Sequence, residues 1–73
     1  MPNKPLSYGI VRKKLEALGF SITSQKGSHV KFIKLILDGT ITTIVPKHNE
    51  ITIGTLKSIL KQGMISNKDF DDV

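Results

Sequence analysis

Apolar residues near the start of the chain recur at helical spacing. The stripe consists of Val11, Leu15 and Leu18. Basic residues fall mostly on the opposite side, which is typical of a helix with one buried face. Ser7 can cap the first turn and Gly19 can end the last one, so the pattern predicts a helix over about residues 7–18.

A second stripe at helical spacing lies in the last third of the chain. It consists of Ile53, Leu56, Ile59 and Leu60. Thr52 can cap this helix and Gly63 can end it. After it, Ser66 begins a weak capping box, which predicts a short final turn whose Phe70 and Val73 dock on the core.

Between the two helices the pattern changes to the alternation of β-strands. One face of the first strand is formed by Phe20, Ile22 and Ser24. Because polar residues alternate with them, we expect a half-buried strand, followed by a turn at residues 26–28. The next strand starts at His29. Its apolar positions change phase after Phe32, which predicts a bulge or a strong twist near that residue.

The second and third strands are expected to form a hairpin. Asp38 and Gly39 stand between two apolar runs, which predicts a two-residue turn of type I′ with positive φ at both positions. The third strand is rich in β-branched residues, spans residues 41–45 and ends at Pro46.

The predicted order is one helix, three antiparallel strands, a second helix and a final turn. Three strands need one covered face to be stable in water, and each helix has a single apolar stripe. Both helices should therefore lie on one face of the sheet, in an α+β two-layer sandwich of α-β-β-β-α order that is similar to a double-stranded-RNA-binding domain. We expect one domain over residues 1–73. Such a fold hosts many activities, so function has to be argued from a site.

The charge of the chain is strongly basic and unevenly distributed. The formal net charge is +5, with eleven Lys and Arg against six acidic residues. Three of the acidic residues lie in the last five positions: Asp69, Asp71 and Asp72. The rest of the chain is therefore denser in positive charge than the total suggests, which suits a nucleic acid. A lysine-rich surface that only keeps the protein soluble explains the same composition.

Several classes of protein are not favoured by the sequence. The chain has no cysteine, and His29 and His48 are its only histidines, with no carboxylate pair at ligand spacing beside them. We therefore expect no metal and no small-molecule cofactor. No apolar run approaches the ~20 residues of a membrane span, and the first residues lack the apolar core of a secretory signal. The expectation is a soluble cytoplasmic protein without a membrane partner.

The residues Gly27, Ser28 and His29, flanked by Lys26 and Lys31, are the strongest candidates for chemistry. A neutral imidazole can accept a proton from an RNA 2′-hydroxyl or donate one to a leaving oxygen. The lysines can stabilise charge on a phosphate, and the glycine lets the backbone approach it closely. The alternative is an ordinary hairpin turn with a surface histidine.

Two further positions carry weaker signals. Lys57 follows Gly54 and Thr55 at the start of the second helix, where the helix dipole and free amides favour a phosphate. Helix capping and a solvated lysine explain the same residues. His48 follows the third strand and can reach the end of the sheet where the second strand starts, although a polar loop residue is the simpler interpretation.

Together these segments resemble the HicA family of toxin–antitoxin ribonucleases. The matching segments are LEALGF (15–20), QKGSHV (25–30), IVP (44–46) with His48, GTLKSILKQ (54–62), IS (65–66) and Phe70. The resemblance implies a fold like that of double-stranded-RNA-binding domains, cleavage of mRNA without a metal, and a HicB-type antitoxin that covers the active site. The family's catalytic histidine carries over onto His29. Residues 31–37, and within them the segment 35–37, depart from the family because they are more apolar than the charged stretch that many members have.

We therefore expect a metal-independent endoribonuclease, an mRNA interferase toxin that inhibits translation. His29 would act as general base or acid, and Lys26, Lys31 and Lys57 would contact phosphates together with the turn before His29. The alternative is a non-catalytic module that binds double-stranded or structured RNA with the same basic surface. A third class, a protein-interaction domain, would show no salt-dependent RNA binding.

Overall fold

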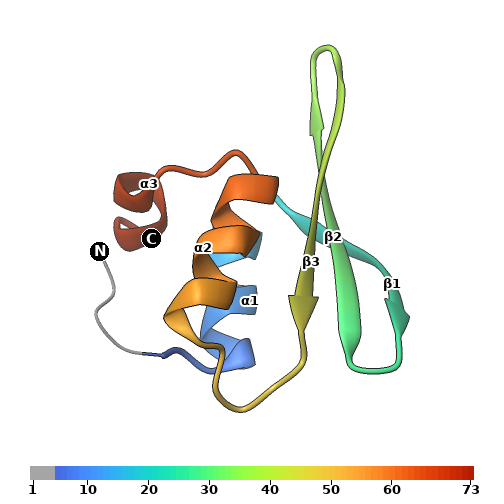
Figure 1. Cartoon of the computed structure of the whole chain (residues 1–73). Helices are drawn as coiled ribbons and strands as arrows, with labels where there is room; N and C mark the ends of the chain where they lie inside the picture. The colour runs from blue at the N-terminus through green and yellow to red at the C-terminus, as the bar shows by residue number, and fades with distance from the viewer. Residues whose placement is uncertain (1–4) are drawn as a thin grey trace.

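The computed structural model describes residues 5–73 of the chain. The expected single domain over residues 1–73 also includes the first four residues, which lie outside the described part. The elements are α1 (Tyr8–Ala17), β1 (Ser21–Lys26), β2 (His29–Ile36), β3 (Gly39–Pro46), α2 (Ile53–Gln62) and α3 (Asn67–Asp71). This order confirms the helix–strand–strand–strand–helix prediction, with the final turn formed by α3 (Figure 1).

The predicted helix ends are confirmed by their capping contacts. Ser7 Oγ accepts from the Ile10 amide at 3.3 Å, and Thr52 Oγ1 accepts from the Thr55 amide at 3.3 Å. Gly19, just beyond α1, has a φ of 97°, the positive value that favours glycine after a helix. Local sequence therefore defines where both long helices begin and where the first one ends.

The three strands form one antiparallel sheet in the order β1-β2-β3, and both long helices cover the same face of it (Figure 1). We call this covered face the inner face and the opposite one the outer face. The buried apolar residues that form the core are Val11, Leu15, Phe20, Val30, Phe32, Val45, Ile51, Leu56, Ile59, Leu60 and Phe70. Thr43 is also buried there, and its hydroxyl donates to the Ile59 carbonyl of α2 at 2.9 Å. The predicted two-layer α+β sandwich is confirmed.

The β1 strand exists as predicted, but the expectation that it is half-buried is wrong. All six of its residues are exposed. Phe20 is buried but precedes the strand, and Ile22 is 45% exposed. The register of β1 against β2 shifts between Ile22 and Ser24, which marks a bulge in this edge strand. Ile22 and Gln25 lie opposite the buried Phe32 and Val30 and so share the inner face, but at this edge of the sheet they stay exposed.

The irregularity predicted near Phe32 occurs in the pairing of β2 with β1, where the register shifts between the partners of Phe32 and Lys31 and the extra residue belongs to β1. It is absent from the pairing of β2 with β3, which runs in continuous register from His29 to Ile36. The apolar residues after Phe32 do not move to the inner face. Instead Ile33 and Leu35 lie on the outer face, and Leu35 is 75% exposed. The phase change in the sequence therefore reflects apolar residues on an uncovered surface and no bulge in the strand.

The hairpin between β2 and β3 is confirmed, but its predicted turn is wrong. Ile36 pairs with Gly39, so the two turn residues are Leu37 and Asp38, and neither has a positive φ. The turn is therefore not type I′. Gly39, with a φ of 144°, is the residue that takes the conformation unfavourable to other side chains.

The C-terminal turn docks on the core through one of the two residues expected to do so. Phe70 is fully buried, whereas Val73 is 44% exposed, which corrects the prediction for that residue. Lys14 of α1 holds the segment by donating to the carbonyl oxygens of Phe70 and Val73 at 3.1 and 2.7 Å. Its ammonium also lies 5.1 Å from the centre of the Phe70 ring. Among the described helices, none has the length and apolar character that a membrane span requires.

Candidate functional site

His29 lies at the first position of β2, at one end of the sheet. It pairs with Lys26 of β1 on one side and with Pro46 of β3 on the other. The next residue, Val30, is fully buried on the inner face. Because successive side chains of a strand point to opposite faces, the exposed His29 lies on the outer face. Its imidazole is therefore open to a large ligand.

Lys26 and Lys31 are brought to the same surface as His29. Lys26 is its cross-strand partner, and Lys31 is two positions further along β2, so both lie on the outer face. Both residues are exposed. None of the three strands contains an Asp or a Glu. The imidazole is thus flanked by two cations on a face without carboxylates, where the potential favours a polyanion.

The turn before His29 is held from both sides. Gln25 Nε2 donates to the Gly27 carbonyl at 3.2 Å, and the Ser28 carbonyl accepts from the Lys47 amide. Gly27 has a φ of 59°, and it is the first of the two turn residues, where a type II′ turn requires such a value. A β-carbon placed on Gly27 would meet nothing within 4 Å, so the surface above the turn is open.

Lys47 belongs to this region and was missed in the sequence analysis. Its backbone bond to Ser28 continues the pairing of β3 with β2 beyond Pro46, which places it beside the turn. Its ammonium lies 5.9 Å from the centre of the Tyr8 ring. The signal was available in principle, because a β2–β3 hairpin necessarily places the end of β3 next to the start of β2.

His48 follows directly and is exposed. Its carbonyl accepts from the Tyr8 amide at 3.1 Å, which ties this loop to the start of α1. The pairing of β2 with β3 places His48 at the same end of the sheet as His29. Nearby, partial burial raises the pKa of the Tyr8 hydroxyl, an effect that the charge of Arg12 opposes and that of Glu16 reinforces. Tyr8 is therefore a protonated hydroxyl at neutral pH.

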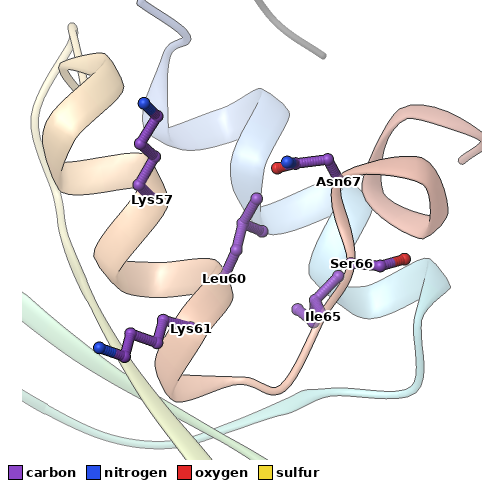
Figure 2. A pocket seen from close by; sticks show the side chains of 6 residues that line it. All are labelled: Lys57, Leu60, Lys61, Ile65, Ser66 and Asn67. Atoms are coloured by element: carbon purple, nitrogen blue, oxygen red, sulfur yellow. The ribbon is translucent and has the colours of Figure 1, made fainter.

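Lys57 is not brought together with His29. It is exposed on α2, in the helical layer that covers the inner face, whereas His29 lies on the outer face. There it lines an open groove of about 560 Å³ between α2 and the segment before α3. The other lining residues are Leu60, Lys61, Ile65, Ser66 and Asn67. Figure 2 shows Leu60 and Ile65 between the two long helices and α3, with Lys57 and Lys61 on the same helix as Leu60 and Asn67 across from them at the start of α3.

Within residues 5–73, no group of three or more His, Cys, Asp or Glu side chains could hold a metal ion. Around the turn, the outer face presents one imidazole, its neighbouring lysines and the backbone of Gly27 and Ser28. Such a set can bind a phosphodiester and move a proton.

Comparison with known proteins points to one family. A family model described as the HicA toxin of bacterial toxin–antitoxin systems matches residues 10–64. The matched span contains all three strands, α2 and most of α1, and with them every candidate site residue from Lys26 to Lys57. No curated protein matches the chain.

Proposed function

The chain belongs to the HicA toxin family of toxin–antitoxin systems, and from this premise we propose that it is a metal-independent endoribonuclease that cleaves mRNA and thereby inhibits translation. His29 is its catalytic residue. The observation that carries the proposal is the position of His29, exposed on a carboxylate-free face between two lysines that share that face.

The residues around His29 match what cleavage of a phosphodiester requires. The 2′-oxygen of the RNA attacks the adjacent phosphorus, and the bond from phosphorus to the 5′-oxygen breaks. His29 takes the proton of the 2′-hydroxyl as a general base, or gives a proton to the leaving 5′-oxygen as a general acid. The products are a cyclic phosphate and a 5′-hydroxyl end, so no water molecule is consumed in this step.

The lysines act on the phosphate. Lys26 and Lys31 stand beside His29 and stabilise the negative charge that develops on the non-bridging oxygens. The open backbone at Gly27 and Ser28 allows the phosphate to approach the turn closely. A second proton transfer falls to a neighbour such as Lys47 or His48, or to a water. Lys57, in the helical layer, contacts a more distant part of the RNA backbone.

Family membership implies a partner from a toxin–antitoxin pair, and we propose that this partner is a HicB-type antitoxin. An antitoxin that covers the outer face near His29 would exclude RNA by occupying the same cations. The proposed substrate also defines the place of action, which is the cytoplasm, where mRNA is found.

The chemistry is tested on one RNA sequence prepared in two forms, with and without 2′-hydroxyl groups, in excess EDTA. The proposal predicts discrete cleavage of the first form, cyclic phosphate ends on its products, and no cleavage of the second. Cleavage of both forms, or loss of activity in EDTA that is restored by a divalent cation, would contradict it.

A further inference from the structure

The hairpin formed by β2 and β3 carries exposed apolar side chains away from the proposed active site. Leu35 is 75% exposed, Ile36 is 43% exposed and Leu37 is fully exposed. Figure 1 shows this end of the hairpin extending past the helices, so no helix covers it. Exposed apolar residues gathered at one end of a sheet are typical of a protein–protein contact.

The same hairpin end has a free strand edge. β3 is an edge strand, and the Ile44 amide, which points away from β2, donates to Gln62 Oε1 at 3.3 Å. Outward amides alternate along an antiparallel strand, so those of Thr42 and Thr40 point the same way. Pro46 has no amide to offer. The part of the β3 edge nearest the helices is therefore blocked, and the part from Gly39 to Thr43 is open.

The opposite edge of the sheet is protected differently. β1 is bulged between Ile22 and Ser24, and bulges discourage pairing with another strand. Its sequence, SITSQK, is mostly polar. Of the two sheet edges in the described structure, only the β3 edge near the hairpin end combines regular backbone, β-branched residues and apolar surroundings. That combination is the one another strand would recognise.

We propose that two copies of this chain associate through the β3 edge, in an antiparallel pair with Ile41 facing its counterpart across a two-fold axis. In this register Thr40 of one copy exchanges backbone hydrogen bonds with Thr42 of the other. The paired segment extends along β3 only as far as Thr43. It does not reach Ile44, whose outward amide already donates to Gln62 Oε1. The two sheets then form one continuous six-stranded sheet, an isologous contact of the commonest kind.

Charge favours a second copy at this position. Residues 39–46 carry no charge, so the paired segments bring only neutral side chains together. Two lysines of β2 lie near the axis: Lys34 pairs with Ile41, level with the axis, and Lys31 pairs with Ile44, three residues from it. Three inter-strand spacings of about 4.8 Å separate each Lys34 from its symmetry mate, roughly 14 Å, and the two Lys31 residues lie farther apart, so both separations exceed the Debye length of about 8 Å. Both outer faces therefore stay open for RNA, with the two His29 side chains at opposite ends of the shared sheet.

The test is sedimentation equilibrium of the full chain over a wide concentration range, together with two variants. The expected result is a rise in average mass from 8.1 kDa toward twice that value. Thr42→Pro removes an outward amide and none of the hydrogen bonds between β2 and β3, a change that an edge strand tolerates. The two-fold axis repeats the hydrogen bond from this amide in each copy, so the substitution removes two hydrogen bonds from the dimer. We therefore expect the dissociation constant to increase about tenfold or more. Circular dichroism checks that the variant is folded.

Leu37→Ser is the matched control. It removes the fully exposed side chain at the tip but leaves the β3 edge intact, so it should still form the dimer. If Leu37→Ser abolishes association while Thr42→Pro does not, the contact is non-specific apolar adhesion and the proposal is wrong. A parent that is monomeric at every concentration also overturns it. If the parent is monomeric and Thr42→Pro no longer binds the antitoxin, the β3 edge is part of the antitoxin contact instead.

A cross-link provides an independent readout. The chain has no cysteine, so Ile41→Cys introduces a single thiol at the proposed axis. Mild oxidation should join two copies through this residue, because facing residues of a non-hydrogen-bonded pair lie about 4.5 Å apart at their Cα atoms. Leu37→Cys, away from the axis, should cross-link far less. Equal cross-linking of the two variants would contradict the proposed register.

Discussion

Lys26 and His29 form the last cross-strand pair of the β1–β2 hairpin, so their side chains leave the same face of the sheet. This relationship converts a short sequence motif into a surface. Two residues separated by a turn become neighbours, and Lys31 joins them because it is two positions further along β2. The proposed ribonuclease activity depends on this arrangement.

The outer-face lysines should contribute to RNA binding through their charge. We expect Lys26→Ala and Lys31→Ala each to weaken RNA binding and to reduce the slope of log affinity against log salt concentration by about 0.7, the value for one contact to a single strand. Fluorescence anisotropy with a labelled RNA at several salt concentrations measures both effects.

Lys34→Ala is the matched control for these variants. Lys34 is half-buried on the inner face, where its ammonium lies 5.9 Å from the centre of the Phe20 ring. The Lys34→Ala substitution should leave the slope of log affinity against log salt concentration unchanged. An equal reduction of the slope by all three substitutions would show that the whole protein charge, and not the outer face, controls binding.

The turn that presents His29 should be sensitive to a single methyl group. Gly27 has a φ of 59°, so Gly27→Ala is expected to lower the free energy of unfolding by about 1–2 kcal/mol, although a β-carbon meets no neighbour. Gly54, inside α2, also has open space around it and no unfavourable φ. The same substitution there should raise the free energy of unfolding by about 0.5–1 kcal/mol.

Urea titration of both glycine variants tests these opposite signs. The midpoint of unfolding should fall for Gly27→Ala and rise for Gly54→Ala, with similar slopes. If Gly27→Ala has no effect on stability, the turn does not hold the positive φ in solution, and the presentation of His29 described above is wrong.

Local features of the fold could be predicted from the sequence, whereas the details of register could not. The caps at Ser7 and Thr52 and the apolar stripes of α1 and α2 depend on residues close in the chain, and they were predicted correctly. The turn was placed one residue too late because pairing of the two strands, and not the preference of Gly39 alone, selects Leu37 and Asp38 as its central residues.

The candidate site shows the same division. Lys26, His29 and Lys31 could be selected because they are adjacent in sequence and alternate along a strand. Lys47 was missed because its contact with Ser28 depends on the register of β2 against β3, in which His29 lies opposite Pro46. Lys57 was selected for its place in the first turns of the second helix, but that helix lies in the other layer, away from His29.

Tyr8 should titrate above its ordinary value. Burial raises its pKa above 10.0 in the folded state, so the folded protein holds this proton more tightly than the unfolded chain. The resulting contribution to stability is fully present below pH 10 and is lost as the pH rises through the folded-state pKa. Tyr8 is the only tyrosine, so the ultraviolet absorbance of tyrosinate reports this residue directly.

Tyr8→Phe provides the control for the stability measurement, because lysines also lose their protons in this range. The parent should lose more stability than Tyr8→Phe between pH 9 and pH 11. Titration of Tyr8 at or below its ordinary value would show that its ring is open to solvent and that the loop at His48 is not packed against α1.

The most direct test of the central claim is cleavage of a labelled mRNA in excess EDTA by the parent and by His29→Ala, at equal concentration. Circular dichroism and a gel shift check that both proteins fold and bind RNA, and Lys34→Ala serves as a variant from the other face of the sheet. The account predicts discrete cleavage by the parent and by Lys34→Ala, and none by His29→Ala although it still binds RNA. Undiminished cleavage by His29→Ala would contradict the assignment of the catalytic residue, and RNA binding without cleavage by all three would show a binding module instead of an enzyme.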